Sequence, residues 1–333
     1  MKIVLDLQGA QSHSRFRGIG RYTLSMARAF AAEAGHHELW LVLNGRQDES
    51  SSGLIEQFSS LIPRERMLIN ELPPGIAGCQ PGNHRRVQIA AAAEAGFFAS
   101  LQPDCIWHSS LFEGWGDDST AALGSGADDH RHVATLYDLI PLLNPSRHLH
   151  DVAYRSWYYR RLGLLKRCGL LLAISESSRR EALDELQIPE DDVAVVFGAA
   201  DPVFRPLRPD AACWSRWQHD WRLQPDFVLY AGGYDAHKNV DALIAAFAEI
   251  PANLSQQHQL VLAGRCDEAI ATQLRMIARR HRLAADRLVF TGTLADEELA
   301  RLYSSCALFV APSLHEGLGL PPLEAMACGA AVI

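Results

Sequence analysis

The sequence lacks several features that mark particular classes of protein. Its seven cysteines are an odd number and contain no Cys-x-x-Cys pair, so we expect free thiols in a reducing compartment rather than a disulfide framework. No apolar run reaches the ~18 residues that a membrane-spanning helix needs. Positive charge is also scarce. The 31 Lys and Arg are outnumbered by 39 Asp and Glu, and the resulting net charge of −8 argues against a nucleic-acid-binding protein.

Fingerprints for metals, dinucleotides and secretion are missing as well. Because no Asp-x-Asp motif or His/Asp cluster stands out, we expect no metal and no other cofactor. Gly18 and Gly20 do not extend to a Gly-x-Gly-x-x-Gly fingerprint, since Thr23 occupies the third glycine position. The first residues, MKIVLD, carry charge too early for a signal peptide. We therefore expect a cytoplasmic protein.

What the sequence does have is a regular alternation of short apolar runs with helix-length segments. The apolar runs predict strands at 2–7, 38–43, 104–108, 132–137, 170–174, 193–197, 227–231, 259–263, 287–291 and 307–311. Helices are predicted at 18–32, 87–100, 151–168, 211–221, 240–249, 267–282 and 295–305, and residues 8–17 are predicted as loop. This alternation predicts an α/β protein with parallel sheets and right-handed crossovers. Prolines between 201 and 225 suit a connection, so we expect domains at 1–205 and 206–333.

The most informative stretch is residues 313–329. It directly follows the predicted strand at 307–311, and we expect that strand to be buried. Gly317 and Gly319 leave a loop with few side chains, so a ligand can approach its backbone closely. Pro321 and Pro322 suit the first turn of a helix. A strand, a glycine-rich loop and a helix N-terminus together make a site for an anion such as a phosphate.

Two carboxylates, Glu316 and Glu324, flank this predicted anion site. Neighbouring hydroxyls can donate to such carboxylates, so the pair suits a sugar–diphosphate–ribose ligand. Alternatively, Glu324 only complements the helix dipole and Glu316 only lies on a solvated loop. The whole block HEGLGLPPLEAMACG resembles the E-x7-E signature of retaining glycosyltransferases of the GT-B fold, and more narrowly the family of glycosyl transferases group 1, or family 4.

The resemblance implies two Rossmann-like, doubly wound domains that face a cleft. Residues 330–333 read as a strand just beginning, so we expect the second domain to be truncated. In such a family Glu316 would hold the donor sugar hydroxyls, and Glu324 the ribose diol of a nucleotide sugar. The loop would meet the sugar and phosphates through the backbone N–H groups of Gly317, Leu318 and Gly319.

A second stretch, residues 229–239, resembles the L-Y-x-G…K-N segment of the same family. That resemblance places Lys238 on the donor diphosphate, where a cation would stabilise the charge of the leaving group. Many relatives have an Arg at the position of Gly233, so the second cation is either absent here or supplied by Arg265 or Arg21. The alternative for Lys238 is an ordinary surface lysine.

Two N-terminal segments complete the predicted site. Gly18 and Gly20 resemble the glycine loop that faces the donor phosphates and acceptor in family 4, although a glycine-eased turn into a helix is the alternative. The segment TLYDLIP resembles the family's H-D-x-x-P, with Tyr137 where many relatives have His. Asp138 is then the catalytic candidate on the acceptor side. His108 is expected to be a strand-end histidine rather than a catalyst.

Residues 6–22 further resemble bacterial mannosyltransferases that build O-antigen chains. This resemblance implies GDP-mannose as donor and a lipid-linked or oligosaccharide acceptor. Because family 4 lacks an agreed nucleophile and its two glutamates bind donor hydroxyls, we expect front-face substitution. UDP-glucose, UDP-N-acetylglucosamine and dTDP-rhamnose remain possible donors. A nucleotide-sugar epimerase and a non-catalytic sugar-nucleotide-binding protein are alternatives from other classes. The presence of both Lys238 and Glu316 favours an enzyme.

The predicted helix at 151–168 combines basic and aromatic residues, a composition that can lie at an anionic bilayer interface. Peripheral contact with the inner membrane is therefore one interpretation. The other is an amphipathic helix packed on the first sheet with solvated arginines. A following helix opens at residues 175–178, with Ser178 and Glu181 at the spacing of a capping box.

Overall fold

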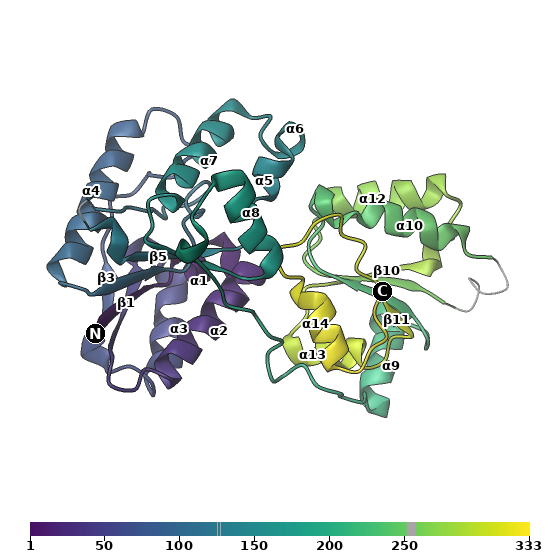
Figure 1. The fold of residues 1–333 in the computed structure, drawn as a ribbon. Coiled ribbons are helices and arrows are strands. Elements are labelled where there is room, and N and C mark those ends of the chain that lie inside the picture. The colour runs from purple at the N-terminus through teal and green to yellow at the C-terminus, as the bar shows by residue number, and fades with distance from the viewer. Residues whose placement is uncertain (125, 127, 252–257) are drawn as a thin grey trace. The chain divides into compact units, whose positions relative to one another are not determined.

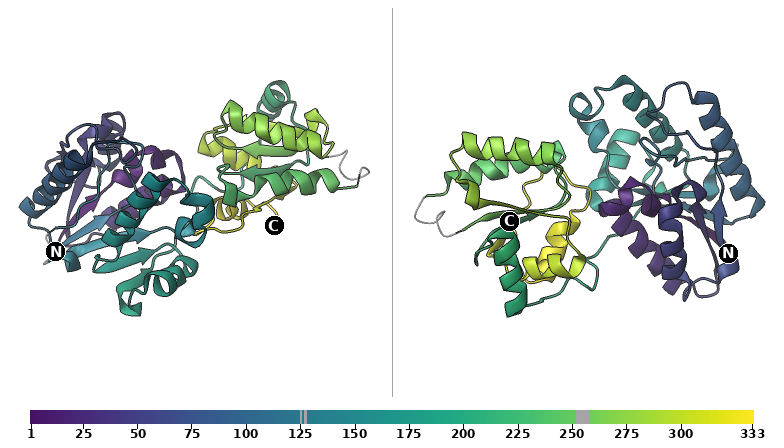
Figure 2. Two further views of the ribbon diagram at one scale, coloured as in Figure 1. Left: turned by 90° about the horizontal axis from the view of Figure 1, so that it is seen from above. Right: turned by 180° about the vertical axis from the view of Figure 1, so that it is seen from behind.

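The structure, a computed structural model, describes residues 1–124, 126, 128–251 and 258–333. The chain divides into two compact units, Met1–Gly198 and Ala199–Ile333, each described below by itself. The predicted boundary between residues 205 and 206 lies a few residues beyond this division. Both units combine a parallel sheet with helices on its two faces (Figures 1 and 2).

The first unit is built on a seven-stranded parallel sheet with the order β3-β2-β1-β4-β5-β6-β7. Its strands are β1 (Lys2–Asp6), β2 (Glu38–Asn44), β3 (Met67–Asn70), β4 (Cys105–His108), β5 (His132–Leu136), β6 (Leu170–Ala173) and β7 (Val193–Val195). Its helices are α1 (Gln8–Gln11), α2 (Gly18–Ala32), α3 (Asp48–Phe58), α4 (His84–Ser100), α5 (Ile140–Leu143), α6 (Pro145–His148), α7 (Val152–Leu165) and α8 (Glu176–Leu186).

Alternating side chains of these strands build two cores. Leu5, Leu41 and Trp107 pack with α2 and α3 on one face of the sheet. Val4 and Ile106 pack with α4 on the other face, where α7 and α8 cover strands β5 and β6. A sheet buried on both faces explains why its strands read as nearly continuous apolar runs.

The second unit has a four-stranded parallel sheet with the order β10-β9-β8-β11. Its strands are β8 (Val228–Ala231), β9 (Leu260–Ala263), β10 (Leu288–Gly292) and β11 (Leu308–Phe309). Helices α10 (Val240–Glu249) and α12 (Glu268–Arg280) cover one face, and α9 (Ala211–Trp221), α13 (Asp296–Tyr303) and α14 (Leu320–Ala327) cover the other (Figure 1). The predicted α/β class with parallel sheets is confirmed in both units.

Three local predictions were wrong. Residues 8–17 are not loop, because they form α1 and a short 3-10 helix at His13–Phe16. Strand β3 was missed, since its four residues follow a basic turn and pair only with β2 at the edge of the sheet. The run 307–311 is shorter and less buried than predicted. Only Phe309 in it is buried, because β11 is an edge strand whose outer side meets a single bridge to Val332.

The predicted capping box of α8 was also wrong. Ser175 is the cap, and its hydroxyl accepts a hydrogen bond from the Ser178 backbone N–H at 3.1 Å. The Ser178 hydroxyl instead donates to the Tyr137 carbonyl. Glu181 accepts from the backbone N–H of Leu139 at 2.7 Å, so it fixes the chain that follows β5.

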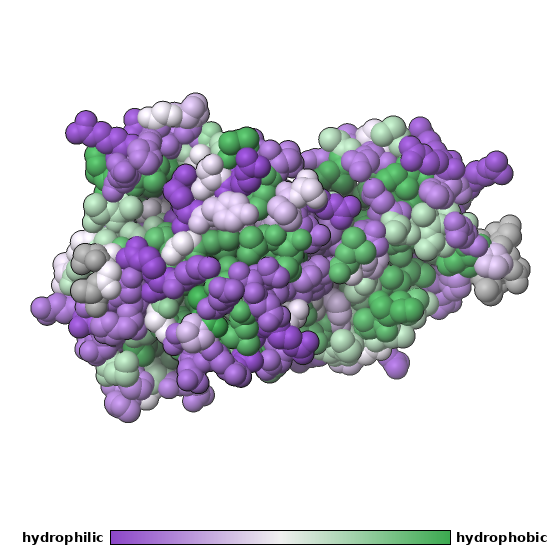
Figure 3. All heavy atoms as spheres, turned by 45° about the horizontal axis from the view of Figure 1, so that its top comes forward, coloured by the Kyte–Doolittle hydropathy of each residue, from purple (hydrophilic) through white to green (hydrophobic). Residues whose placement is uncertain are grey.

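Helix α7 is packed within its own unit. Trp157, Tyr158, Leu162 and Leu165 are buried against the sheet, which confirms the packed-helix interpretation. Arg161 is not solvated, because its guanidinium is buried and donates to the carbonyls of Glu113 and Ala121. Among the described residues, no helix is both long and apolar enough to cross a bilayer. The face shown in Figure 3 carries hydrophobic patches interspersed with hydrophilic residues.

Candidate functional site

The carboxyl edge of the second sheet is bare of side chains at three neighbouring strand ends. Gly232, Gly264 and Gly292 follow or end β8, β9 and β10. Gly264 has a φ of +146°, and a Cβ on it would lie 2.2 Å from the Gly232 carbonyl oxygen. Only glycine fits there. Gly264 and Gly292 were not predicted as site residues, although a glycine at or directly after the end of each apolar run was a usable signal.

The predicted glycine-rich loop lies at the same edge, between β11 and α14. Gly319 adopts a left-handed conformation with φ +78° as the N-cap of α14, whose first turn contains proline as predicted. This loop is tied to the segment after β8 by two hydrogen bonds. The Leu314 backbone N–H donates to the His237 carbonyl at 2.8 Å, and the Asn239 side chain donates to the Pro312 carbonyl at 3.1 Å.

These ties bring Lys238 and Glu316 together. The Lys238 ammonium donates to both carboxylate oxygens of Glu316, at 2.7 and 2.8 Å. Both side chains are partly exposed, at 20 % and 32 %. The two residues were predicted to contact different parts of a ligand, and their pairing was not predicted.

Glu324 lies in α14 and is buried, with 4 % of its surface exposed. Its Oε2 accepts a hydrogen bond from the hydroxyl of Tyr303, which is fully buried on α13. A carboxylate has about four acceptor positions, and this bond occupies one of them. Tyr303 was missed because its partner lies 21 residues away on another helix.

The candidate second cations differ in position. Arg265 directly follows Gly264 and is exposed. It makes no recorded hydrogen bond or ion pair with the part of the chain that the structure describes. Arg21 lies on α2 of the first unit. Within the described residues, no three His, Cys, Asp or Glu side chains gather as a metal ion would need.

The first unit presents the other predicted residues at the carboxyl edge of its own sheet. Gly18 is the exposed first residue of α2, and Gly20, two residues later, is buried. A Cβ at Gly20 would lie 2.5 Å from the Arg15 Cα, so glycine lets the 3-10 helix at His13–Phe16 pack on α2. Gly20 therefore has a packing role whether or not it faces a ligand.

Tyr137 and Asp138 follow β5 but differ in environment. The Tyr137 hydroxyl lies 3.0 Å from the Thr23 hydroxyl and donates to the Ser109 carbonyl at 2.9 Å. Burial raises the pKa of Tyr137. Its hydroxyl is used in hydrogen bonds that hold the chain in place, so it is not free for a ligand. Asp138 is partly exposed, and its Oδ1 accepts from the Ile140 backbone N–H at 3.0 Å.

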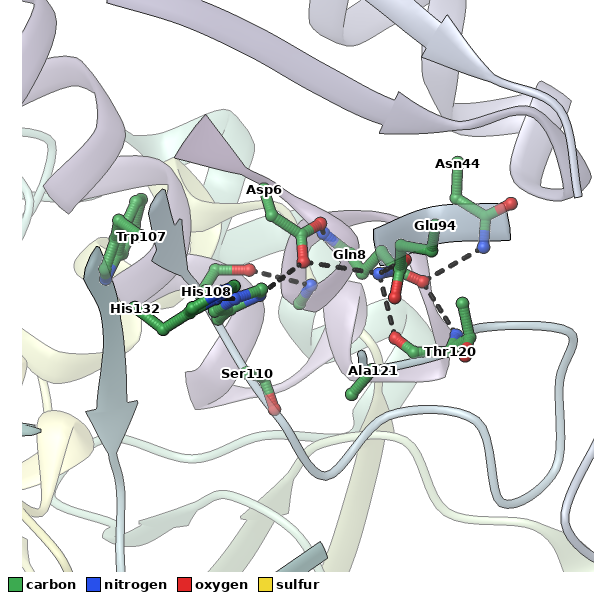
Figure 4. A network of polar contacts seen from close by, with 12 residues as sticks. Asp6, Gln8, Asn44, Glu94, Trp107, His108, Ser110, Thr120, Ala121 and His132 are labelled. Carbon is green, nitrogen blue, oxygen red and sulfur yellow. Dashed lines mark hydrogen bonds and ion pairs between the residues drawn. The ribbon is translucent and has the colours of Figure 1, made fainter. Parts of the chain in front are cut away.

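His108 is part of a buried chain of polar groups that crosses three strands (Figure 4). Its Nδ1 lies 3.2 Å from Asp6 Oδ2 on β1, and its Nε2 lies 2.8 Å from His132 Nδ1 on β5. Because a carboxylate only accepts, Asp6 orients the proton onto His108 Nδ1, and His132 then donates to His108 Nε2. Burial, with the nearby His108, lowers the pKa of His132 to about 4. His108 is thus a strand-end structural residue, as expected.

A second polar chain meets this one at Asp6. The Gln8 amide donates to Asp6 Oδ2, to Glu94 Oε1 and to the Thr120 carbonyl, while its oxygen accepts from Asn44 (Figure 4). Burial, and then the charge of Asp6, raise the pKa of Glu94 well above its usual value. These hydrogen bonds tie α1 and α4 to the carboxyl ends of β1 and β2.

Family models match both units. The Glycosyltransferase Family 4 model matches residues 16–204, and the Glycosyl transferases group 1 model matches residues 215–333. The chain is 35 % identical over 334 aligned residues to the serotype-specific mannosyltransferase WbdA of Escherichia coli, covering 100 % of this chain and 40 % of that protein. It is also 30 % identical over 207 residues to O-antigen chain mannosyltransferase B of Escherichia coli, over 61 % of this chain and 52 % of that one.

Solved structures share the fold at low sequence identity. Sucrose-phosphate synthase from Thermosynechococcus elongatus matches with a TM-score of 0.66 and 19 % identity, over 100 % of this chain and 80 % of that one. Anabaena HepE, in complex with UDP and glucose, matches with a TM-score of 0.61 and 19 % identity, over 99 % and 79 %. The chain spans less than half the length of the WbdA relative that it matches. These matches confirm the predicted GT-B fold class.

Proposed function

The chain belongs to glycosyltransferase family 4, and we propose that it transfers mannose, with retention, from GDP-mannose to a growing bacterial polysaccharide. One observation carries this proposal. The glycine-bare carboxyl edge of the second sheet holds a preformed Lys238–Glu316 pair beside a helix N-terminus and the Glu324 carboxylate. The names of the two mannosyltransferase relatives support mannose as the sugar.

The proposed roles in donor binding follow from charge. The diphosphate takes Lys238, the backbone N–H groups of Leu318 and Gly319 in the loop before α14, and the positive end of the α14 dipole, since each stabilises negative charge. Arg265, exposed at the end of β9, is the second cation. Glu316 accepts from the sugar hydroxyls, and Glu324, held by Tyr303, accepts from the ribose diol. Lys238 then contacts both the diphosphate and Glu316, so it couples the leaving group to the sugar.

The reaction proposed is a front-face substitution. The bond from the anomeric carbon to the β-phosphate oxygen breaks, and a bond to the acceptor oxygen forms on the same face. The acceptor proton passes to the departing phosphate oxygen, so no enzyme nucleophile is required. The positive ends of Lys238 and α14 stabilise the nucleoside diphosphate as it leaves. No metal and no other cofactor takes part in this scheme.

We place the acceptor on the first unit, where Asp138 is the catalytic candidate and Gly18 is the exposed first residue of α2. The acceptor is an oligosaccharide, lipid-linked in the cell, and the reaction takes place in the cytoplasm at the inner membrane surface. Any membrane contact through α7 uses its exposed residues Arg155, Tyr159 and Arg160, because Trp157 and Tyr158 are packed inside. Vesicle flotation of Arg155→Glu/Arg160→Glu tests that contact without disturbing the buried Arg161.

The experiment that tests the proposal is a donor panel. The chain is incubated with an α-linked mannose tetrasaccharide and one of four donors: GDP-mannose, UDP-glucose, UDP-N-acetylglucosamine or dTDP-rhamnose. The masses of the products are measured by mass spectrometry. We expect one added hexose with GDP-mannose and none in the variant Glu316→Gln. Transfer from another donor instead would refute mannose, and release of a free epimerised sugar nucleotide would indicate an epimerase.

A further inference from the structure

Trp115 is a rigidly held, partly exposed ring in the loop that follows β4. A Cβ on Gly78 would lie 2.9 Å from the Trp115 ring and 2.7 Å from the Trp157 ring, so the Gly78 backbone packs against both indoles. Backbone hydrogen bonds from Gly78 N–H to the Gly114 carbonyl (2.8 Å) and from Cys79 N–H to the Trp115 carbonyl (2.9 Å) fix the loop. The indole is therefore held in place before any ligand arrives.

Tyr154, in the first turn of α7, extends this aromatic surface. Its ring meets Trp115 edge to face, with centroids 5.1 Å apart and an interplanar angle of 71°. Trp157 lies beneath both, 5.7 Å from Trp115 and 5.6 Å from Tyr154, and is buried. Trp115 and Tyr154 remain partly exposed. The arrangement is a two-ring platform on a buried third ring.

Charged groups border the platform. Burial, and then the charge of nearby Asp138, raise the pKa of Tyr154, while the charge of Arg17 lowers it. On the Trp115 side, Gly116 lies against the His13 imidazole, with 3.7 Å between the position of a Cβ on Gly116 and His13 Nδ1.

A buried carboxylate stands next to Trp115 in the same loop. Glu113 Oε2 accepts from the hydroxyls of Ser12 and Ser14, at 2.5 and 2.9 Å. Its Oε1 is buried and has no hydrogen-bond partner within the described structure. Glu113, Ser12 and Ser14 thus form a polar cluster between the 3-10 helix at His13–Phe16 and the loop that carries Trp115.

We propose that Trp115 and Tyr154, with the Asp138 carboxylate, form a subsite for pyranose rings of the glycan acceptor. The proposal rests on the function proposed above and adds where the acceptor is recognised. One face of a pyranose presents C–H groups, which are attracted to the negative faces of aromatic rings, while its rim of hydroxyls donates to carboxylates. The carboxyl edge of a parallel sheet is also where such folds bind ligands. Trp115 and Tyr154 position the sugar, and its reacting hydroxyl lies toward Asp138.

The test measures glycan binding without donor. An α-linked mannose tetrasaccharide is titrated into the chain by calorimetry, with GDP titrated separately. Trp115→Ala and Tyr154→Ala should each weaken tetrasaccharide binding about tenfold or more and leave GDP affinity unchanged. Trp115→Phe should retain most of the binding, because it keeps a ring. Tyr159→Ala is the matched control, since Tyr159 is an exposed tyrosine on the same helix outside the platform.

The outcomes separate this subsite from the proposed function. Unchanged tetrasaccharide binding in Trp115→Ala, or an equal loss in Tyr159→Ala, would overturn the subsite. A loss of GDP affinity in Trp115→Ala would mark the platform as a nucleotide site and also overturn it. A wild-type chain that binds GDP but no tetrasaccharide overturns the subsite alone. A chain that binds the tetrasaccharide through Trp115 but transfers from no donor overturns the function and leaves the subsite standing. Saturation-transfer NMR on wild type, irradiating aromatic protons, should label the sugar ring protons without any substitution.

Discussion

The Lys238 ammonium is clamped by both oxygens of the Glu316 carboxylate, at 2.7 and 2.8 Å, although 78 residues separate the two in sequence. The pair forms because β8 and β11 are neighbouring parallel strands, and Lys238 and Glu316 lie in the segments that follow them. Both side chains are partly exposed, and ion pairs of that kind contribute little to folding stability. The pair is therefore better explained as a preorganised part of a ligand-binding site than as an ion pair that stabilises the fold.

Replacing Lys238 should reduce donor affinity far more than stability. In Lys238→Met we expect GDP binding to weaken by about 10- to 100-fold, because a hydrogen bond to a charged group contributes about 1.5–3 kcal/mol. Thermal unfolding should shift by only a few degrees. Calorimetry with GDP is the measurement, and Lys166→Met, on an exposed lysine after α7, is the control. Equal GDP affinity in both variants contradicts the assignment.

The two glutamates should separate binding from transfer. Glu324→Ala should mainly weaken nucleotide binding, by about tenfold, whereas Glu316→Ala should mainly lower kcat. Tyr303→Phe removes only the hydrogen bond that orients Glu324, so its effect on nucleotide affinity should have the same direction and a smaller size. Unchanged GDP and UDP affinity in Glu324→Ala would rule out a ribose contact.

Much of this site could be read from the sequence because its signals are local. Gly319, the prolines of α14 and the glutamate spacing all lie within one short stretch, and the structure shows the loop and helix start that they predict. The helix Val240–Glu249 likewise matches its predicted bounds, since its apolar face is regular.

Contacts between distant segments could not be read in this way. The Lys238–Glu316 and Tyr303–Glu324 pairs depend on strand order, which no single stretch encodes. Strand β3 was missed because a short edge strand needs little apolar sequence. The polar composition of residues 8–17 predicts a loop, but Gln8 and Gln11 are buried, and their amides tie α1 to β2 and α4.

Substitutions at two glycines should separate steric from conformational effects. Gly264→Ala places a methyl group against the Gly232 carbonyl, so we expect a loss of several kcal/mol in the free energy of unfolding. Gly292 also has a positive φ, of +70°, but nothing lies within 4 Å of a Cβ there. Gly292→Ala should therefore cost only about 1–2 kcal/mol, the conformational strain alone. Urea denaturation measures both, and equal losses would refute the close contact.

Stability should rise with pH between about 4 and 6.5 through His132. The folded state holds its imidazole neutral, with a pKa of about 4, while the unfolded chain protonates it near pH 6.5. The stabilisation is present above pH 6.5 and is lost as pH falls toward 4, with a total on the order of 3 kcal/mol. Glu94, whose pKa is raised, acts in the opposite direction.

A comparison of variants isolates the His132 effect from that of Glu94. Denaturation of wild type and His132→Asn from pH 4 to 7 should show a shallower rise in the variant. His130→Asn, at an exposed position two residues earlier, should keep the wild-type slope. A wild-type slope in His132→Asn would show that its burial does not control this pH dependence.

The anomeric configuration of the product formed in the presence of a chelator is the most direct test of metal-free, retaining transfer from GDP-mannose. GDP-mannose carrying carbon-13 in the sugar is incubated with the chain, an α-linked mannose tetrasaccharide and EDTA, and the one-bond carbon–proton coupling at the new linkage is read by NMR. We predict an α-linked mannose, formed at the same rate with and without EDTA, because Lys238 and the start of α14 take the place of a metal. A β-linked product, transfer that requires manganese, or no transfer from GDP-mannose would contradict this mechanism.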